Sequence, residues 1–504
     1  MALIPATETP PITITRKLAP SGSNCDAIVV LILGASSRPD FSDLPAAEQW
    51  QAMHRRSRVA AGQVRSCTLP NSKQTLAVLG YLAADATPFE QLALAGRVVR
   101  EALAREARNL GVAVIDNKPT PTRDSALEAL LSAALVQDFP LPSFRSKPGG
   151  GARLRRLIAR GDAGINVARV SAIAAGQNLA RWLTALPPNK LNALAYRRIL
   201  RHLAATHGLR LSWLSEAVLR RAGAGAFLAV AAGNARRDAA GIAHLSYRPR
   251  HRSAAKPDVA LVGKGILFDT GGTNLKTHRG MLDMHTDMAG SAVALATLVT
   301  LAQLQAPIAA DAWLAITENR AGATAYQPQD IVRAANGTTI QVIHTDAEGR
   351  MVLADTLVLA GRSKPALILD FATLTGAAVQ ALTERMSAVF APDSRLVAPL
   401  LEAARISGER VVLFPMDADF DADIDSKVAD VAQCAVEGKG DHILAARFLQ
   451  RFVPVKMPWI HVDLASATRT GGLGHVTTDV IGFGVRLVME LLQGQNVLNA
   501  LGQP

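Results

Sequence analysis

The sequence predicts an α/β protein, with a small N-terminal α/β domain and a larger C-terminal α/β domain that has a mixed, largely parallel central sheet. Three observations predict it. Short apolar runs alternate with segments of helical periodicity over most of the 504 residues. The composition is 49% hydrophobic and 19% charged, which is typical of a globular protein. A segment rich in proline and glycine, residues 139–152, separates a shorter first part from a longer second part.

The first 140 residues contain three apolar runs that predict strands, at residues 27–33, 76–79 and 112–115. Between the second and third runs, residues 88–110 repeat apolar side chains at helical spacing. This alternation predicts a small α/β domain over residues 1–150.

A basic linker and a connecting helix are expected over residues 151–190. Residues 166–186 are rich in alanine, have a helical pattern and end at two prolines. Six basic side chains precede the first acid, Asp162, and they are Arg145, Lys147, Arg153, Arg155, Arg156 and Arg160.

Residues 191–504 return to the alternation of strand and helix, which predicts a largely parallel sheet covered on both faces. The apolar runs that predict its strands are residues 209–214, 242–247, 259–268, 312–316, 340–343, 366–371 and 459–464. One further segment, residues 288–310, has no charged residue and is long enough to span a membrane. Its glutamines, its proline and its acidic flanks favour a buried helix instead, so we expect no membrane association.

Charge and cysteine content narrow the class of protein. The net charge is +12. Residues 1–250 contain 33 Lys and Arg against 16 Asp and Glu, whereas residues 251–504 contain 21 against 26. Three scattered cysteines without a C-x-x-C motif exclude a disulfide scaffold and a cysteine-rich zinc module. Together with an N-terminus that lacks the pattern of a signal peptide, they predict a cytoplasmic protein.

Several common catalytic and nucleotide-binding motifs are absent from the sequence. It contains no H-E-x-x-H, G-x-S-x-G, G-x-x-x-x-G-K-[ST] or G-x-G-x-x-G. The sequence therefore does not support a zinc protease of the H-E-x-x-H type, a serine hydrolase with the G-x-S-x-G turn, or a protein with one of the common nucleotide-binding loops.

The segment VGKGILFDTGGTNLKTHRGMLDMHTDMAGS, residues 262–291, gathers charged residues around the end of a predicted strand. Lys264 and Asp269 bracket that strand end, which is where parallel sheets bind ligands. Lys276 and Asp287 follow within about twenty residues, and Asp287 precedes the uncharged helix. Each residue also has a purely structural interpretation, as a solvated lysine, a turn former or a helix cap.

The segment HTDAEGRM, residues 344–351, again follows an apolar run and precedes an apolar helix. Asp346, Glu348 and Arg350 alternate, so an extended chain would point all three to one side. The alternative is a charged surface turn with a Glu348–Arg350 pair, which would be worth little. Several acids in one pocket repel one another unless cations are present, so the two segments together predict a two-metal hydrolase.

The strings VGKGILFDTGG, MLDMHTDMAG and TDAEGRMVLAD resemble the leucyl aminopeptidase (cytosol aminopeptidase) family. LPPNKLNA, DFATLTGA, DHILAARFL and WIHVDLASA are similar to further family landmarks, in the same order. The resemblance covers about residues 165–490. It implies that residues 191–504 form the catalytic two-metal peptidase domain, and that the chain forms a homohexamer of two stacked trimers.

The resemblance also implies a ligand set. Each subunit would hold two divalent ions, which would be zinc, manganese or magnesium. One ion would be held by Lys264, Asp269, Asp287 and Glu348, and the other by Asp269, Asp346 and Glu348. Asp269 and Glu348 would therefore bridge the two ions.

The same resemblance assigns the chemistry. A water that bridges the metals would attack the scissile bond, and Lys276 would polarise the carbonyl as the electrophile. Arg350 would hold a bicarbonate that acts as general base. The substrate's free amino group would bind one metal and Asp287, so N-terminal residues of peptides, leucine-like ones preferred, would be removed. Residues 373–376 would line the site with backbone groups.

Three positions depart from the family pattern without removing an expected metal ligand. His344 stands where the family usually has asparagine. The sequence of the loop at residues 320–329 differs from the family pattern, and DMAGS replaces DMGGA. Two alternatives remain. The basic N-terminal half is consistent with an additional DNA-binding or regulatory role. A catalytically dead relative is disfavoured, because all seven expected catalytic positions are filled.

Overall fold

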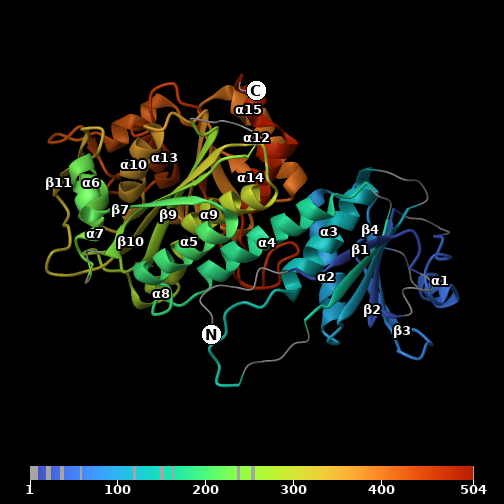
Figure 1. The fold of residues 1–504 in the computed structure, drawn as a ribbon. Helices are drawn as coiled ribbons and strands as arrows, with labels where there is room; N and C mark the ends of the chain where they lie inside the picture. The colour runs from blue at the N-terminus through green and yellow to red at the C-terminus, as the bar shows by residue number, and fades with distance from the viewer. Residues whose placement is uncertain are drawn as a thin grey trace.

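The computed structural model describes residues 9–18, 24–34, 39–56, 60–116, 121–147, 153–161, 164–234, 236, 239–250 and 256–502. These residues form two large sheets that lie side by side, with helices between and around them (Figure 1). The structure is mixed α/β with mostly parallel strand pairs, as the sequence predicts. No helix in the described ranges is both long enough and apolar enough to cross a membrane.

The N-terminal sheet has six strands in the order β1-β6-β5-β2-β4-β3, all parallel except β3. The three predicted strands are confirmed. The helix predicted at residues 88–110 ends at residue 103, and β5 begins at residue 109. The elements are β1 (Ile12–Thr15), β2 (Ala27–Leu33), α1 (Ala47–Arg55), β3 (Val64–Thr68), β4 (Leu76–Leu82), α2 (Pro88–Leu103), β5 (Asn109–Ile115), α3 (Pro121–Asp138) and β6 (Arg156–Arg160).

The segment predicted as a basic linker contributes a strand to this sheet. Residues 148–152 and Asp162 lie outside the described residues, but β6 pairs in parallel with both β1 and β5. Arg153 and Arg160 form ion pairs with Asp138 and Asp43. Part of the basic run is therefore neutralised within the chain.

The expected connecting helix is α4 (Val167–Thr184), which contacts both α3 and α9 and lies between the two sheets (Figure 1). Its alanine-rich sequence lets α9 approach closely. A Cβ at Gly176 would collide with the hydroxyl of Thr300 on α9. One apolar cluster consequently runs from β2 and α2 through α4 to α9 and β9.

The C-terminal sheet has eight strands in the order β15-β14-β17-β13-β9-β10-β8-β7, with a parallel centre formed by β17, β13, β9 and β10. Its strands are β7 (Arg210–Ser215), β8 (Gly241–Tyr247), β9 (Val259–Asp269), β10 (Ala310–Asn319), β13 (Leu367–Ala372), β14 (Ser387–Phe390), β15 (Val411–Leu413) and β17 (Trp459–Asp463). A separate small sheet contains β11 (Ile331–Arg333), β12 (Thr339–Gln341) and β16 (Val431–Ala432). The run predicted at residues 340–343 thus belongs to the small sheet.

Helices cover both faces of the C-terminal sheet, because successive side chains of a strand point to opposite sides. Val259 and Leu261 of β9 join the apolar cluster of α9, whereas Ala260 and Val262 join that of α10. The uncharged segment is α9, a buried helix as predicted. The helices are α5 (Ala193–His207), α6 (Glu216–Ala222), α7 (Gly225–Ala231), α8 (His278–Met281), α9 (Ala289–Gln303), α10 (Glu348–Gly361), α11 (Gly376–Leu382), α12 (Ser394–Ser407), α13 (Asp441–Gln450), α14 (Val485–Met489) and α15 (Val497–Ala500), with short turns η3 (Met284–Thr286), η4 (Thr383–Arg385), η5 (Ala418–Ile424) and η6 (Glu490–Gly494).

Candidate active site

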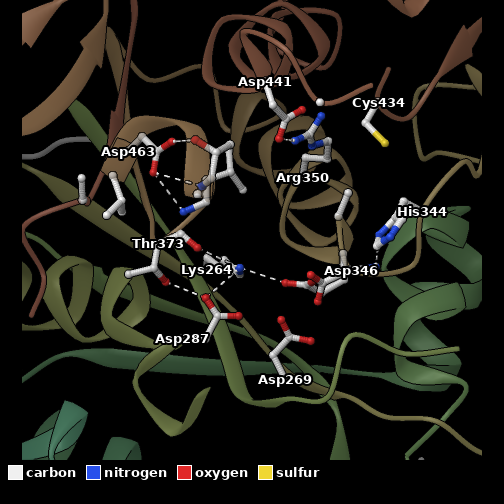
Figure 2. A pocket seen from close by; sticks show the side chains of 18 of the residues that line it. Lys264, Asp269, Asp287, His344, Asp346, Arg350, Thr373, Cys434, Asp441 and Asp463 are labelled. Atoms are coloured by element: carbon white, nitrogen blue, oxygen red, sulfur yellow. Dashed lines mark hydrogen bonds and ion pairs between the residues drawn. The ribbon is translucent and has the colours of Figure 1, made fainter. Parts of the chain in front are cut away.

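A cavity of about 690 Å³ opens at the carboxyl ends of the parallel strands of the C-terminal sheet (Figure 2). All seven residues singled out from the sequence line this cavity, and they are Lys264, Asp269, Lys276, Asp287, Asp346, Glu348 and Arg350. The structure therefore brings together two segments that lie far apart along the chain.

Lys264 lies inside β9 with a side chain that is only 4% exposed, so it is not a solvated surface lysine. Its Nζ lies 2.8 Å from Asp287 Oδ1 and 2.8 Å from Glu348 Oε1, and it donates to the carbonyl oxygen of Thr373. Burial alone would lower the pKa of Lys264, but the surrounding carboxylates outweigh burial and raise it above its ordinary value. A Cβ at Gly349 would lie 2.7 Å from this Nζ, so the glycine provides the room for the ammonium group.

Asp287 does not cap the helix that follows it. Met288 occupies the N-cap position of α9 and makes no side-chain capping bond. Asp287 Oδ1 instead pairs with Lys264 and accepts a hydrogen bond of 2.7 Å from Thr373 Oγ1. Asp287 Oδ2 is buried and has no hydrogen-bond partner among the described residues, and burial raises the pKa of this carboxyl to about 6. An unpartnered carboxylate oxygen faces a cluster of other ionisable groups here.

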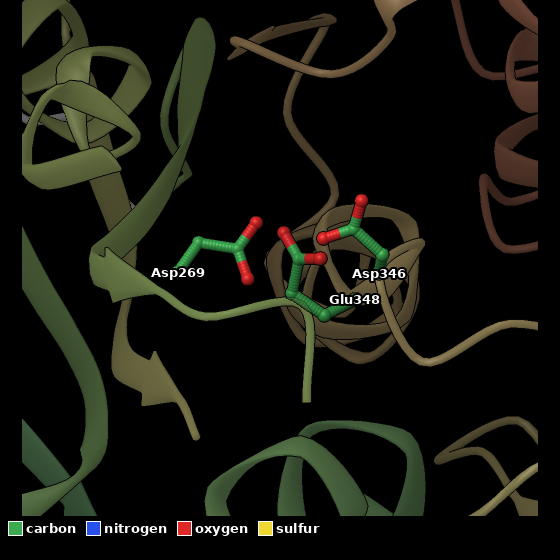
Figure 3. A group of neighbouring side chains, drawn as sticks. All are labelled: Asp269, Asp346 and Glu348. Atoms are coloured by element: carbon green, nitrogen blue, oxygen red, sulfur yellow. The ribbon is translucent and has the colours of Figure 1, made fainter. Parts of the chain in front are cut away.

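Asp269, Asp346 and Glu348 form a compact group at the end of β9 and the start of α10 (Figure 3). One carboxylate oxygen of each lies within 4.8 Å of the others. Burial, and then the charge of Asp269, raise the pKa of Glu348 to about 8. This spacing suits ligands of a single cation.

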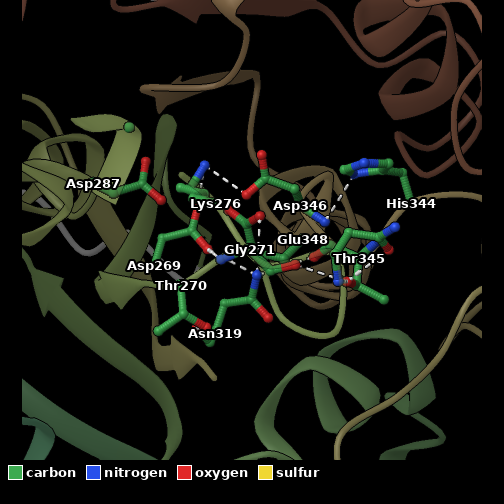
Figure 4. Close-up of polar contacts among 12 residues, drawn as sticks. Asp269, Thr270, Gly271, Lys276, Asp287, Asn319, His344, Thr345, Asp346 and Glu348 are labelled. Carbon is green, nitrogen blue, oxygen red and sulfur yellow. Dashed lines mark hydrogen bonds and ion pairs between the residues drawn. The ribbon is translucent and has the colours of Figure 1, made fainter. Parts of the chain in front are cut away.

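Lys276 supplies the positive charge beside this group. Its Nζ lies 3.0 Å from Asp269 Oδ2 and 2.5 Å from Asp346 Oδ1 (Figure 4). Burial would lower the pKa of Lys276, but the carboxylates raise it above its ordinary value, so the ammonium form persists. Positive φ angles at Gly271 (87°) and Gly272 (66°) form the turn that brings Lys276 back to the end of β9, as the two glycines predict.

Asn319 is a residue to which the sequence assigned no role. It ends β10, next to β9, and its Nδ2 lies within hydrogen-bond distance of Asp269 Oδ1 (2.8 Å), the Thr345 carbonyl (3.0 Å) and Glu348 Oε2 (3.4 Å). It therefore orients two carboxylates that the sequence places on different elements. Its position at the end of a central strand was the available indication.

Arg350 lies on α10, so the expectation of an extended chain with three alternating side chains is wrong. The helix begins at Glu348, and a Glu348–Arg350 pair does not form. Arg350 instead pairs with Asp441 Oδ2 at 2.6 Å and donates to the carbonyl of Gln433 at 3.1 Å. Arg350 Nε is buried without a partner. Asp441 had no predicted role, because it lies about 90 residues away in sequence.

The loop at residues 373–376 is held by Asp463 at the end of β17. Asp463 Oδ1 accepts hydrogen bonds from the backbone N–H groups of Leu374 (3.0 Å) and Thr375 (3.4 Å), and Oδ2 accepts one from Thr375 Oγ1 at 2.7 Å. Because the adjacent Thr373 contacts both Lys264 and Asp287, the carboxylate of Asp463 positions the backbone that faces the charged cluster.

His344 lies at the rim of the cavity, where the family pattern usually has asparagine. Its Nδ1 accepts a hydrogen bond of 3.3 Å from the backbone N–H of Asp346. That bond places the proton of a neutral ring on Nε2.

Comparisons with known proteins agree with this geometry. Residues 178–489 match the model of the cytosol aminopeptidase family, catalytic domain. A probable cytosol aminopeptidase of Synechococcus sp. (strain RCC307) is 35% identical over 486 residues, which cover 93% of this chain and 95% of the relative.

Solved structures give the same result. The bottromycin maturation enzyme BotP in complex with Mn superposes with a TM-score of 0.82 and 32% identity, covering 93% of this chain and 99% of that one. A point mutant of tomato leucine aminopeptidase superposes with a TM-score of 0.84 and 26% identity, covering 97% of this chain and 98% of that one.

The fold and the charged cavity define a metal-dependent exopeptidase. More particularly, the chain belongs to the cytosol aminopeptidase family, and it is a leucyl aminopeptidase-type metallo-exopeptidase that uses divalent metal.

Proposed function

We propose that this enzyme removes N-terminal residues, leucine-like ones preferred, from peptides with a free amino terminus by using two divalent cations. One cation would be held by Lys264, Asp269, Asp287 and Glu348, and the other by Asp269, Asp346 and Glu348. The observation that carries the proposal is the carboxylate group with ligand atoms within 4.8 Å of one another, beside the unpartnered Oδ2 of Asp287. Such a set of buried anions suits divalent cations.

The bound cations would lower the pKa of a shared water and polarise the scissile carbonyl. Manganese is supported by the manganese complex of the neighbour BotP, and zinc and magnesium are the other candidates. Lys264 can ligate only as a neutral amine, so metal loading must displace its proton.

Two side chains of the cavity would act on the substrate directly. Lys276 stays protonated, and its ammonium would donate to the carbonyl oxygen and stabilise the negative charge that develops there. Asp287 would accept a hydrogen bond from the substrate's free amino group, which as a neutral amine would also bind one of the cations. These contacts would restrict cleavage to the N-terminal residue, because an internal peptide nitrogen is an amide and does not bind a cation in this way.

Arg350 fits a bicarbonate general base only in part. Its Nη1 donates to the Gln433 carbonyl and its Nη2 to Asp441, and its buried Nε has no partner among the described residues. The carboxylate of Asp441 already supplies an anionic partner to this guanidinium. We therefore derive no catalytic step from bicarbonate, and dependence of the rate on added bicarbonate would support its role.

Assembly and location remain parts of the proposal. The cytosol aminopeptidase names of the relatives support a cytoplasmic location, and a homohexamer is the assembly that the family resemblance implies. An additional DNA-binding role has little support, because Arg153 and Arg160 of the basic run are engaged in ion pairs within the chain.

The test is hydrolysis of a panel of aminoacyl-p-nitroanilides by the purified protein with added manganese or zinc. Hydrolysis should be fastest for leucine-like residues and should vanish in Glu348→Ala. The control Glu402→Ala removes a partly exposed glutamate of α12 that pairs with Arg405, away from the cavity, and it should retain full activity. A metal-loaded protein that hydrolyses no aminoacyl substrate would overturn the proposal.

A further inference from the structure

A second cavity, of about 190 Å³, lies where helices α2, α3 and α4 meet α12 and α14. It shares no lining residue with the active-site cavity. The helices that line it come from the N-terminal sheet and from the part of the chain near the C-terminus, and Figure 1 shows these helices next to one another. Charged groups of both signs line it, together with apolar and polar side chains.

The positive side of the cavity is Arg486 of α14. Its Nε donates to the carbonyl of Ser407 at 3.1 Å and its Nη1 to Ser132 Oγ at 3.2 Å. Within the described part of the chain, the guanidinium has no carboxylate at ion-pair distance, although Glu409 and Glu128 are close enough to raise its pKa against the lowering effect of burial. A partly buried guanidinium without an ionic partner favours an anionic group.

The negative side is Glu128 of α3. The structure gives its carboxylate no hydrogen bond and no ion pair among the described residues. Arg169, which also lines the cavity, is already paired with Glu490 at 2.7 Å. Burial raises the pKa of Glu128, while the charges of Arg169 and Arg486 lower it in part. Glu128 and Arg486 therefore face one cavity, feel each other's charge and do not touch.

The remaining wall is mixed. Leu92 on α2, Val170 and Ile173 on α4, and Ile406 on α12 contribute apolar side chains, and four polar side chains also line it, those of Gln91, Ser125, Ser132 and Ser407. A simple anion would meet the two glutamates, and a simple cation would meet the two arginines. A small molecule that carries both charges could pair with Arg486 and Glu128, and an apolar group on it could contact the apolar side chains. The volume is below the 300 to 1,000 Å³ or so of typical drug-sized ligand pockets, so the molecule must be small.

We propose that this cavity binds a free α-amino acid with an apolar side chain, its carboxylate at Arg486 and its ammonium at Glu128. Free amino acids are what an aminopeptidase releases, so the second site would sense product without using the catalytic residues. The site would also couple product concentration to the helices between the two sheets.

The test is equilibrium dialysis of the metal-loaded enzyme against radiolabelled leucine. The wild type should bind two equivalents per chain, one at the active site and one here. Glu128→Gln keeps the size of the side chain and removes its charge, and it should lose one equivalent or weaken it at least tenfold. The matched control Asp124→Asn removes an exposed charge one turn earlier on α3, and it should bind as the wild type does.

A second variant separates loss of binding from misfolding, and a second ligand tests the need for the ammonium group. Arg486→Gln should lose the same equivalent while its circular-dichroism melting curve remains cooperative. N-acetyl-leucine, which lacks the ammonium, should not compete for this site. Equal leucine stoichiometry and affinity in wild type and Glu128→Gln would overturn the proposal. Because dialysis measures binding alone, failure of peptide hydrolysis would not affect this outcome.

Discussion

The two sheets of this molecule follow the same construction and end differently. In the N-terminal sheet, β2 and β4 are uniformly buried, and neither strand carries a charged residue. In the C-terminal sheet, β9, β10 and β17 end in Asp269, Asn319 and Asp463. Parallel strands covered by helices therefore do not create a site by themselves. The polar side chains at their carboxyl ends do.

The charge balance follows the same division. Among the described residues before 162, Asp138 is the buried carboxylate, and it is neutralised by Arg153 and by the backbone N–H of Leu154. The acids of the second half include the buried cluster around Lys264 and Lys276. The basic excess of the first half is thus separate from the chemistry, and the net charge of +12 does not indicate the substrate.

The largest expected effect comes from removing one lysine from each half of the chain, which tests whether the chemistry lies in the second half. Lys276→Met should lower kcat/KM by about 10³-fold, because it would delete the proposed donor to the developing oxyanion. Lys147→Met removes an exposed lysine of the first half and should leave kcat/KM unchanged. Steady-state kinetics on leucyl-p-nitroanilide measures both, and a similar loss in the two variants would contradict the division.

A glycine substitution tests the packing around the cluster. Gly349→Ala places a Cβ 2.7 Å from Lys264 Nζ, so the lysine must move from its carboxylates. We expect a loss of about 10²-fold in kcat with cooperative unfolding retained. Gly164→Ala is the matched control, since its Cβ would have no neighbour within 4 Å. Full activity of Gly349→Ala would show that the position of Lys264 is unimportant.

Two buried aspartates allow a comparison of function with structure. Asp463→Asn should reduce kcat by about 10-fold to 100-fold, because the loop that carries Thr373 loses its charged acceptor. Asp138→Asn should lower the urea midpoint and leave kcat unchanged, since Asp138 only joins α3 to the segment before β6. A loss of stability in Asp463→Asn with an unchanged kcat would contradict the proposal that Asp463 positions the loop at residues 373–376.

The smallest effect concerns a buried carboxylate of the second half that lies outside the active site. Glu409 accepts from the backbone N–H groups of Gly484 and Leu487, its Oε1 has no partner, and burial raises its pKa from 4.5 to about 7. Burial of ionised Glu409 therefore destabilises the fold, by less than about 0.5 kcal/mol at pH 4.5 and by about 3 kcal/mol above pH 7.

Glu409→Gln removes that charge and should stabilise the protein by up to this amount at pH 8.5 and not at pH 4.5. Urea unfolding at the two pH values measures the difference. Glu402→Gln changes a partly exposed glutamate of α12 whose pKa is lowered by its pair with Arg405, and it should give no gain in stability at pH 8.5. A gain that is the same at both pH values would contradict the assignment to charge burial.

The parts of the fold that were predicted are those fixed by local pattern. Residues 27–33 and 259–268 are uniformly apolar because both faces of their sheets are covered, and both form strands. Two strands were not predicted, β3 and β6. Strand β3 lies at the edge of its sheet and is only partly buried, so it has no continuous apolar run, and the apolar residues of β6 are flanked by arginines.

The site divides in the same way. Lys264 and Asp269 were predicted as site residues because they lie at a strand end, and Glu348 because it joins a strand-like run to a helix, and all three line the cavity. Asp441 and Asp463 act through long-range contacts with Arg350 and the loop at residues 373–376, which no local pattern records. Recognition of family motifs supplied the roles that spacing alone left open.

The central claim is that the carboxyl ends of the C-terminal sheet hold two divalent cations. The most direct measurement is the metal content of the purified, manganese- or zinc-loaded protein by inductively coupled plasma mass spectrometry, in parallel with Glu348→Gln. Two ions per chain in the wild type are predicted, with at most one in the variant, because Glu348 would contact both. Hydrolysis of leucyl-p-nitroanilide by a wild type that contains no divalent metal, or an unchanged metal content in Glu348→Gln, would contradict it.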